Sequence, residues 1–184
     1  PLNSAYSSTD GVLLDKNQGT LIQFPGGRSG SYVVPDSVTS IGNGAFSHCT
    51  GLMSVTIGNN VTSIGDYAFL GCTALTAFTV DPLNSLYSSP DGVLLDKSQR
   101  TLVQFPGGRK GSYVVPESVT RIGGNAFSSC TGLTSVIIPS SVNRIEGFAF
   151  QDCRGLRSVY FVGNAPVSSI PIEPPWASSA SRQK

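Results

Sequence analysis

Short apolar runs recur along this chain, each with the alternation of a short strand. In the segment LMSVTI, Leu52, Val55 and Ile57 are apolar, whereas Ser54 and Thr56 are polar. Successive side chains of a strand point to opposite faces, so the pattern predicts that the three apolar residues face a core and that the polar pair faces outward. The same spacing returns at Leu75, Leu133 and Leu156. One strand per repeat is therefore predicted.

A second apolar pattern precedes each strand. In VTSIGNGAF the apolar residues are spaced by three, four and one, which is typical of a helical or 3-10 turn with one apolar side: Val38, Ile41, Ala45 and Phe46. Both patterns repeat after 23 residues, from Val38 to Val61 and again from Val119 to Val142. A unit this short cannot bury its apolar face alone, so the units must stack on one another.

A longer repeat encloses the short one. The segment from Pro1 returns from Pro82 with 50 of 81 aligned positions identical, so residues 1–81 form copy one and residues 82–163 form copy two of a tandem duplication. Each copy also contains two apolar runs around a polar turn, DGVLLDKNQGTLIQFPGG and DGVLLDKSQRTLVQFPGG, which predict a β-hairpin. Asp10 and Asp15, with Asp91 and Asp96 in copy two, are either turn residues or a calcium site, and we favour turns.

These periods predict a right-handed leucine-rich-repeat solenoid over residues 1–163. We expect six short parallel strands on one face, turns and 3-10 or short helices on the other, and two β-hairpin insertions. Residues 164–184 are rich in Pro and Ser and lack the repeat. This tail is either a makeshift cap over the last repeat or a disordered remnant, and its apolar residues are Ile170, Ile172 and Trp176.

The repeat units VTSIGDYAFLGCTALTAFTV and VTRIGGNAFSSCTGLTSVII resemble the BspA-like leucine-rich repeats of bacterial and protist surface proteins. The resemblance covers nearly all of residues 1–163, and its features recur in four units at one spacing. It implies a cell-surface or secreted module that binds proteins or glycans, as in adhesion. It implies no catalytic residue and no cofactor.

Composition narrows the possible partners further. The chain has 184 residues, 39% of them hydrophobic and 12% charged, and a formal net charge of +1. This charge gives no indication of nucleic-acid binding, and no run of 18 apolar residues exists to insert into a membrane. The first residues lack the basic and apolar regions of a signal peptide, so they do not decide localisation.

The one histidine raises the possibility of an enzyme. Ser47 and His48 are adjacent, which suggests an esterase-like hydrolase as an alternative function. In the other units, however, Gly71, Ser129 and Asp152 occupy the position of His48. No carboxylate stands where it would orient the ring, so we interpret His48 as a variable turn residue and expect no catalytic residue.

The four cysteines share one position in the unit, three residues after the repeated phenylalanine: Cys49, Cys72, Cys130 and Cys153. Neighbouring units would bring them within range of a disulfide, but side chains in such a ladder point the same way. We favour buried free thiols over disulfides. Their spacings contain no C-x-x-C pair, so no metal site is expected.

Two groups of residues remain as candidate binding sites. The first is the outward, concave face of the strands, a ligand-binding surface that competes with a purely structural spacer role: Ser31, Val33, Ser54, Thr56, Ala77, Thr79, Ser112, Val114, Ser135, Ile137, Ser158 and Tyr160. The second is a basic patch in copy two: Arg121, Arg144, Arg154 and Arg157.

The two copies also differ in charge. Two basic and five acidic residues give −3 for residues 1–81, whereas eight basic and five acidic residues give +3 for residues 82–163. Opposite charges at the two ends are compatible with end-to-end self-association.

Overall fold

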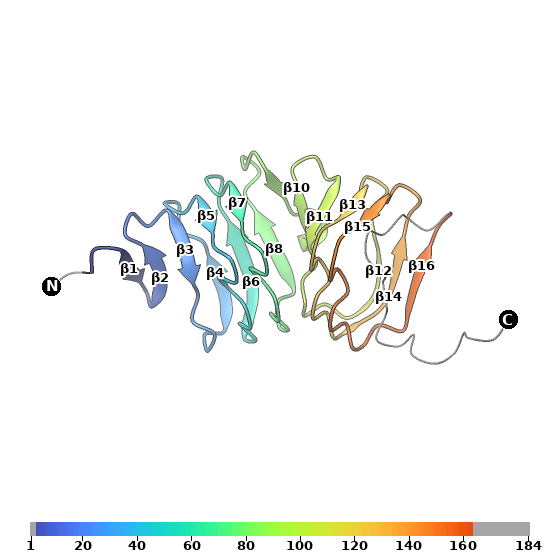
Figure 1. The fold of residues 1–184 in the computed structure, drawn as a ribbon, viewed down its shortest axis with the longest axis horizontal. Coiled ribbons are helices and arrows are strands. Elements are labelled where there is room, and N and C mark those ends of the chain that lie inside the picture. The colour runs from blue at the N-terminus through green and yellow to red at the C-terminus, as the bar shows by residue number, and fades with distance from the viewer. Residues whose placement is uncertain (1–2, 164–184) are drawn as a thin grey trace.

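The protein is a solenoid in which the repeats stack from one end to the other (Figure 1). The computed structural model describes residues 3–163, so the two interpretations of the tail at residues 164–184 lie outside the described residues. The six predicted strands are confirmed and form two parallel sheets of three. Sheet 1 contains β4 (Gly30–Val33), β6 (Leu52–Ile57) and β8 (Ala77–Val80). Sheet 2 contains β12 (Gly111–Val114), β14 (Leu133–Ile138) and β16 (Ser158–Phe161).

The opposite wall consists of one five-stranded sheet in each copy. Copy one contributes β1 (Tyr6–Thr9), β2 (Val12–Asp15), β3 (Thr20–Gln23), β5 (Ser40–Ile41) and β7 (Ser63–Ile64). Copy two contributes β9 (Tyr87–Ser88), β10 (Leu94–Asp96), β11 (Thr101–Gln104), β13 (Arg121–Ile122) and β15 (Arg144–Ile145).

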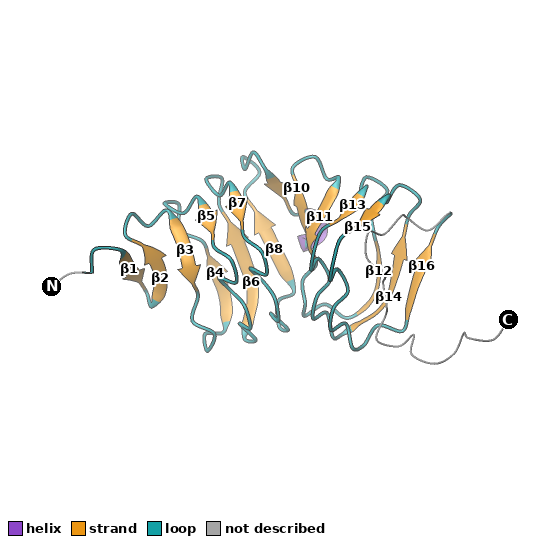
Figure 2. Ribbon diagram, viewed as in Figure 1, coloured by secondary structure: helices purple, strands orange, loops and turns teal. Residues whose placement is uncertain are grey.

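Turns dominate this wall, as expected, but the helices are not found there. Within residues 3–163 the one helix is the 3-10 turn η1 (Pro90–Gly92), which lies beside the second hairpin (Figure 2). The segments that contain the repeated Ala-Phe pair are turns between two-residue strands. Each holds a residue with left-handed φ of 57° to 63°, namely Gly44, Tyr67, Asn125 or Phe148. Such a residue interrupts the run of right-handed backbone that a helix requires.

The two predicted hairpins are confirmed, and they are part of the wall itself. β2 pairs with β3 and β10 pairs with β11 in antiparallel fashion. β3 and β11 then pair in parallel with β5 and β13, so each hairpin begins the ladder of short strands. The aspartates act as turn residues: Asp15 Oδ1 accepts a hydrogen bond from the Thr20 amide (2.9 Å), and Asp96 Oδ1 accepts one from the Thr101 amide (2.8 Å).

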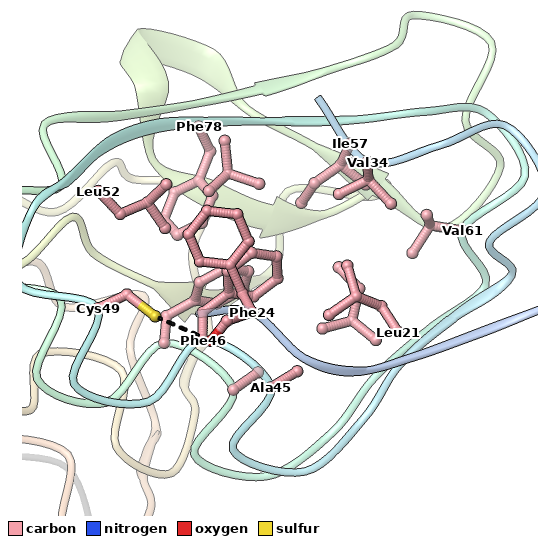
Figure 3. Close-up of a cluster of buried hydrophobic side chains, with 14 of the residues drawn as sticks. Leu21, Phe24, Val34, Ala45, Phe46, Cys49, Leu52, Ile57, Val61 and Phe78 are labelled. Atoms are coloured by element: carbon pink, nitrogen blue, oxygen red, sulfur yellow. Dashed lines mark hydrogen bonds between the residues drawn. The ribbon is translucent and has the colours of Figure 1, made fainter. Parts of the chain in front are cut away.

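A column of phenylalanine rings fills the core of each copy. In copy one, the Phe46 ring lies 5.2 Å from that of Phe24 and is stacked 5.1 Å from that of Phe69. Aliphatic side chains of both walls surround the column (Figure 3). The inward residues predicted in the first unit are all buried, with at most 1% of each exposed: Val38, Ile41, Ala45, Phe46, Leu52, Val55 and Ile57.

The stack is interrupted where the two copies meet. β8 and β12 do not pair, so the six strands form two ladders of three (Figure 1). The segment that contains β10 lies between the two cores. Leu94 packs into the core of copy one, whereas Val93 and Leu95 pack into that of copy two. All three are at most 1% exposed, as expected for a strand covered on both faces.

Candidate functional site

The structure brings the predicted outward residues together as two columns on each sheet. Strand pairing places Ser31 beside Ser54 and Ser54 beside Ala77 in sheet 1. Sheet 2 repeats this arrangement with Ser112, Ser135 and Ser158. The serines bond to one another along the column: Ser54 Oγ donates to Ser31 Oγ, and Ser135 Oγ donates to Ser112 Oγ, both at 2.7 Å.

The second column differs between the sheets. In sheet 1 it consists of Val33, Thr56 and Thr79. In sheet 2 it consists of Val114, Ile137 and Tyr160. Val114 is 60% exposed and Tyr160 is 59% exposed, with the half-buried Ile137 between them. Sheet 2 therefore presents an apolar column beside a hydroxyl column, whereas the face of sheet 1 is mostly polar.

The predicted basic patch is divided between two places. Arg121 and Arg144 are register partners on β13 and β15. Both contact the Glu146 carboxylate, at 2.6 Å and 3.3 Å. Arg154 and Arg157 belong to the segment that leads to β16, and Arg154 forms a 3.7 Å ion pair with Asp152. Much of the basic charge is thus balanced locally, and the four arginines do not lie on one sheet.

His48 lies in a turn and is exposed. Its φ is 57°, and the residues at the equivalent position of the other units also have left-handed φ: 72° at Gly71, 60° at Ser129 and 55° at Asp152. Its amide donates to the Leu70 carbonyl of the next unit (2.7 Å). No hydrogen bond joins the Ser47 and His48 side chains among residues 3–163. The position behaves as the turn residue that the comparison of units predicts.

The four cysteines are free and buried. The Cys72 thiol donates to the carbonyl of Phe46 in the preceding unit (3.0 Å), and the Cys153 thiol donates to that of Phe127 (2.8 Å). Burial raises the pKa of Cys72 to about 12 and raises that of Cys49. The thiolate is the nucleophile and metal ligand of cysteine, so burial makes Cys49 and Cys72 structural thiols. This agrees with the prediction of buried thiols.

The sequence gives no signal for one further feature, a cleft between the copies. Its volume is about 200 Å³, and it is lined from both sides, by residues that include Tyr67 and Asp66 of copy one and Gln104 and Asn125 of copy two. The Asn125 Oδ1 atom is buried there without a hydrogen-bond partner among the described residues. These residues are far apart in the sequence, so only the packing of the copies brings them together.

No group of three or more His, Cys, Asp or Glu side chains within residues 3–163 is arranged to hold a metal ion. No helix in that part of the chain is long and apolar enough to cross a membrane.

Three solved structures of similar fold come from bacteria. The pneumococcal vaccine antigen PcpA superposes with a TM-score of 0.61 at 22% identity, over 71% of this chain and 38% of that one. A leucine-rich cell surface protein from Faecalibacterium prausnitzii gives 0.55 at 30% identity, over 88% and 40%. A leucine-rich repeat protein from Eubacterium ventriosum gives 0.60 at 22% identity, over 75% and 42%. The chain spans about two fifths of the length of these structures.

Comparison with curated proteins returns no match. The model of the BspA type leucine rich repeat region, however, matches residues 24–110 and 109–172, in six copies of the repeat. These ranges include every strand of sheets 1 and 2 and the phenylalanine column of each core. The chain belongs to the BspA-type leucine-rich repeat family.

Proposed function

We propose that this chain is a non-catalytic binding module of a cell-surface or secreted protein and that it binds a protein ligand on the outer face of sheet 2. The apolar column of Val114, Ile137 and Tyr160 carries the proposal. It lies on a regular sheet, where backbone pairing holds the side chains in fixed positions. Exposed apolar residues that form a continuous row are typical of interaction sites.

The hydroxyl column supplies the polar part of the same surface. Ser112, Ser135 and Ser158 lie beside the apolar column in register. The Ser135 Oγ already donates to Ser112, so a ligand would add bonds to an ordered row. An apolar centre with polar groups at its edge resembles the organisation of protein interfaces. We favour a protein over a glycan because two of the three apolar residues are aliphatic.

Two observations support a surface location and a binding role. The neighbour from F. prausnitzii, which shares 30% identity with this chain, is a cell surface protein. The competing hydrolase would need Ser47 and His48 to interact, and no hydrogen bond between their side chains is present in the described residues. Adhesion would be one use of such a module at a cell surface.

The test is a binding screen of the purified chain against extracellular-matrix proteins and a glycan array. We expect a protein ligand whose affinity falls at least about tenfold, or about 1.4 kcal/mol, when Val114→Thr and Tyr160→Thr are combined. The matched control is Val33→Thr in sheet 1, which is similarly exposed and should leave binding unchanged. Binding that survives the double substitution would place the ligand elsewhere. Glycan binding alone would overturn the choice of ligand, and no binding at all would favour a structural spacer.

A further inference from the structure

The Ala-Phe turn of each unit holds the equivalent turn of the next unit through its backbone. In copy one, the Gly44 amide of the first unit donates to the Asp66 carbonyl of the second (2.9 Å), and the Phe46 amide donates to the Ala68 carbonyl (2.8 Å). A side chain adds a third bond, because Asn43 Oδ1 accepts from the Asp66 amide (2.9 Å). Two amides and one side-chain oxygen thus hold three backbone groups of the next turn.

Copy two repeats the backbone part of this contact. The Asn125 amide donates to the Gly147 carbonyl (3.2 Å), and the Phe127 amide donates to the Ala149 carbonyl (2.7 Å). These donors occupy the same two positions of the unit as the donors of copy one. In both copies, therefore, the amides at these positions point along the stack, towards the turn that follows.

The second unit of copy one carries the equivalent groups at Asp66, Tyr67 and Phe69. Within residues 3–163, neither the Tyr67 amide nor the Phe69 amide donates a hydrogen bond, and the Asp66 carboxylate has no hydrogen-bond or ion-pair partner. Asp66 and Tyr67 are exposed, and all three residues line the cleft between the copies. The second unit thus presents two donors and an acceptor to the cleft without a turn for them to hold.

The hairpin of copy two lines the other side of this cleft and accounts for the missing partner. In a unit, five positions separate the isoleucine of the two-residue strand from the phenylalanine of the core column, as from Ile64 to Phe69. In the hairpin, only three positions separate Leu102 from Phe105. The hairpin is therefore two residues shorter where the cleft of about 200 Å³ lies.

The copy-two side of the cleft adds a polar group of its own. Asn125 lines it, and the Asn125 Oδ1 atom has no hydrogen-bond partner among the described residues. Gln104 lies beside it, with its Nε2 already donating to the carbonyls of Phe105 (3.1 Å) and Ala126 (3.3 Å). The cleft thus combines unpaired backbone donors with unpaired side-chain acceptors. A peptide main chain supplies the matching carbonyl and amide groups, one of each per residue.

We infer that the cleft binds a short turn-forming segment of a partner protein through its main chain, at a second site on the wall opposite sheet 2. The Asp66 carboxylate accepts a hydrogen bond from one amide of the segment. The Tyr67 amide donates to the carbonyl of that same residue, and the Phe69 amide donates to the carbonyl two residues later. The segment takes the place that the next turn takes within each copy. Recognition of this kind rests on main-chain bonds, with small pockets supplying specificity.

The equivalent turns indicate which residues the segment should contain. The third residue of each turn has a left-handed φ of 57° to 63°, and an alanine that is at most 3% exposed follows it in all four units. Glycine and asparagine adopt left-handed backbone most easily. A cleft of about 200 Å³ has room for only a few residues. We therefore expect a segment with Gly-Ala or Asn-Ala at its centre.

The test is an NMR titration of the full ¹⁵N-labelled chain with the capped peptide acetyl-Gly-Gly-Asn-Ala-amide, which copies the turn of residues 123–126. We expect saturable shifts of the Tyr67 and Phe69 amide signals with a Kd of about 1 mM, in a titration that reaches about 10 mM. The control peptide has sarcosine in place of the second glycine. It lacks the amide that donates to Asp66, so it should bind at least about tenfold more weakly. Absence of saturable shifts overturns the inference, as does equal binding of the two peptides.

A substitution in the protein tests the same bond from the other side. Asp66→Ala should weaken binding of the glycine peptide at least about tenfold. The matched control is Asp36→Ala, because Asp36 is also an exposed carboxylate of copy one but does not line the cleft. Equal binding by the two variants contradicts the inference. If Asp66→Ala does not fold, the comparison of the two peptides on the wild-type chain still decides the result.

The two binding sites can be tested independently. The combined Val114→Thr and Tyr160→Thr substitutions lie on sheet 2 and should leave binding of the peptide unchanged. Asp66→Ala should in turn leave the ligand of sheet 2 bound. Shifts that appear on sheet 2 rather than at Tyr67 and Phe69 would place the peptide on the other site and would overturn the inference about the cleft.

Discussion

The segment DGVLLDK occurs once in each copy with the same seven residues and two different environments. In copy one it forms β2 at the end of the stack, where Val12 and Leu14 are buried and Leu13 between them is 37% exposed. In copy two it contains β10 at the centre, where the equivalent Leu94 is fully buried. The environment of such a residue is therefore set by its place in the stack, because the covering surface belongs to another repeat.

The junction also differs from the contacts within each copy. Within a copy, neighbouring units are joined by backbone pairing and by stacked phenylalanines. Between the copies, the β8 and β12 strands do not pair, and the connection rests on side chains such as Asn84 and Leu94 and on a bond from the Gly108 amide to the Leu75 carbonyl (2.7 Å). Fewer backbone bonds cross the junction, so we expect the two copies to be coupled mainly by apolar burial.

We expect the largest loss of unfolding free energy from substitutions in the phenylalanine columns. Phe127 is fully buried, 5.1 Å from the Phe105 ring and 4.9 Å from the Phe150 ring. Phe127→Ala should lower the free energy of unfolding by about 3–5 kcal/mol, measured by urea denaturation, because stacked neighbours cannot collapse into the cavity. Phe69→Ala, in the second unit of copy one, should fall in the same range. A loss below about 1 kcal/mol would mean that the ring is not part of the core.

Leu94 and its copy-one equivalent Leu13 should show the next largest difference in unfolding free energy when each is substituted. Leu94→Ala should cost about 2–4 kcal/mol of unfolding free energy, since it opens a cavity between the two cores. Leu13→Ala should cost less than about 1 kcal/mol, because Leu13 is covered on one side only. Both variants are compared by urea denaturation at a protein concentration low enough to exclude self-association. Equal losses of unfolding free energy would contradict the interpretation that Leu94 helps to join the two copies.

The four cysteines should be unreactive in the folded protein, because all four side chains are buried. Burial raises the pKa of Cys72 to about 12, so the thiolate that reacts with a disulfide reagent is scarce in the folded state. Titration should detect no thiol in the native protein and four after denaturation. Because the folded state holds the Cys72 proton more tightly, stability should fall as the pH rises from 9 towards 12. Four thiols missing after denaturation would indicate disulfides instead.

A substitution at Phe148 should have a smaller effect and should raise the free energy of unfolding. This residue has a φ of 60° and is 60% exposed, and its equivalent in the first unit of copy two is Asn125, also at 60°. Asparagine tolerates left-handed backbone better than a bulky aromatic residue does. Phe148→Asn should therefore raise the free energy of unfolding by about 0.5–1 kcal/mol. Tyr160→Asn, a similarly exposed aromatic in a strand, is the control and should give no gain.

The smallest effect is expected at His48. The equivalent positions accept glycine, serine and aspartate, and His48 itself is exposed. His48→Ala should change the free energy of unfolding by no more than about 0.5 kcal/mol and leave ligand binding unchanged. An esterase assay is the control. Suppose that the wild type hydrolyses an ester and that the folded His48→Ala variant hydrolyses it about 10²-fold more slowly. His48 is then catalytic, and the non-enzymatic proposal is wrong.

Much of the fold could be predicted because it depends on apolar patterns within each 23-residue unit. The 23-residue period predicted which residues face inward, and Phe46, Leu52, Val55 and Ile57 are buried as expected. The alignment of units also identified His48 as a turn residue. The predicted helices are absent because Tyr67 and Phe148 adopt a left-handed backbone conformation, which their residue types do not predict.

The residues of the candidate site could be predicted from the sequence, but their arrangement in two separate sheets could not. The sequence by itself determined the repeat, the core and the two outward columns, because period-2 alternation sorts side chains between the faces of a strand. Only the tertiary structure decided that the columns form two separate ladders, that Glu146 balances Arg121 and Arg144, and that a cleft opens beside Asn125. The two copies of DGVLLDK show the reason: identical residues acquire different exposure according to the surface packed against them, and that surface is distant in the chain.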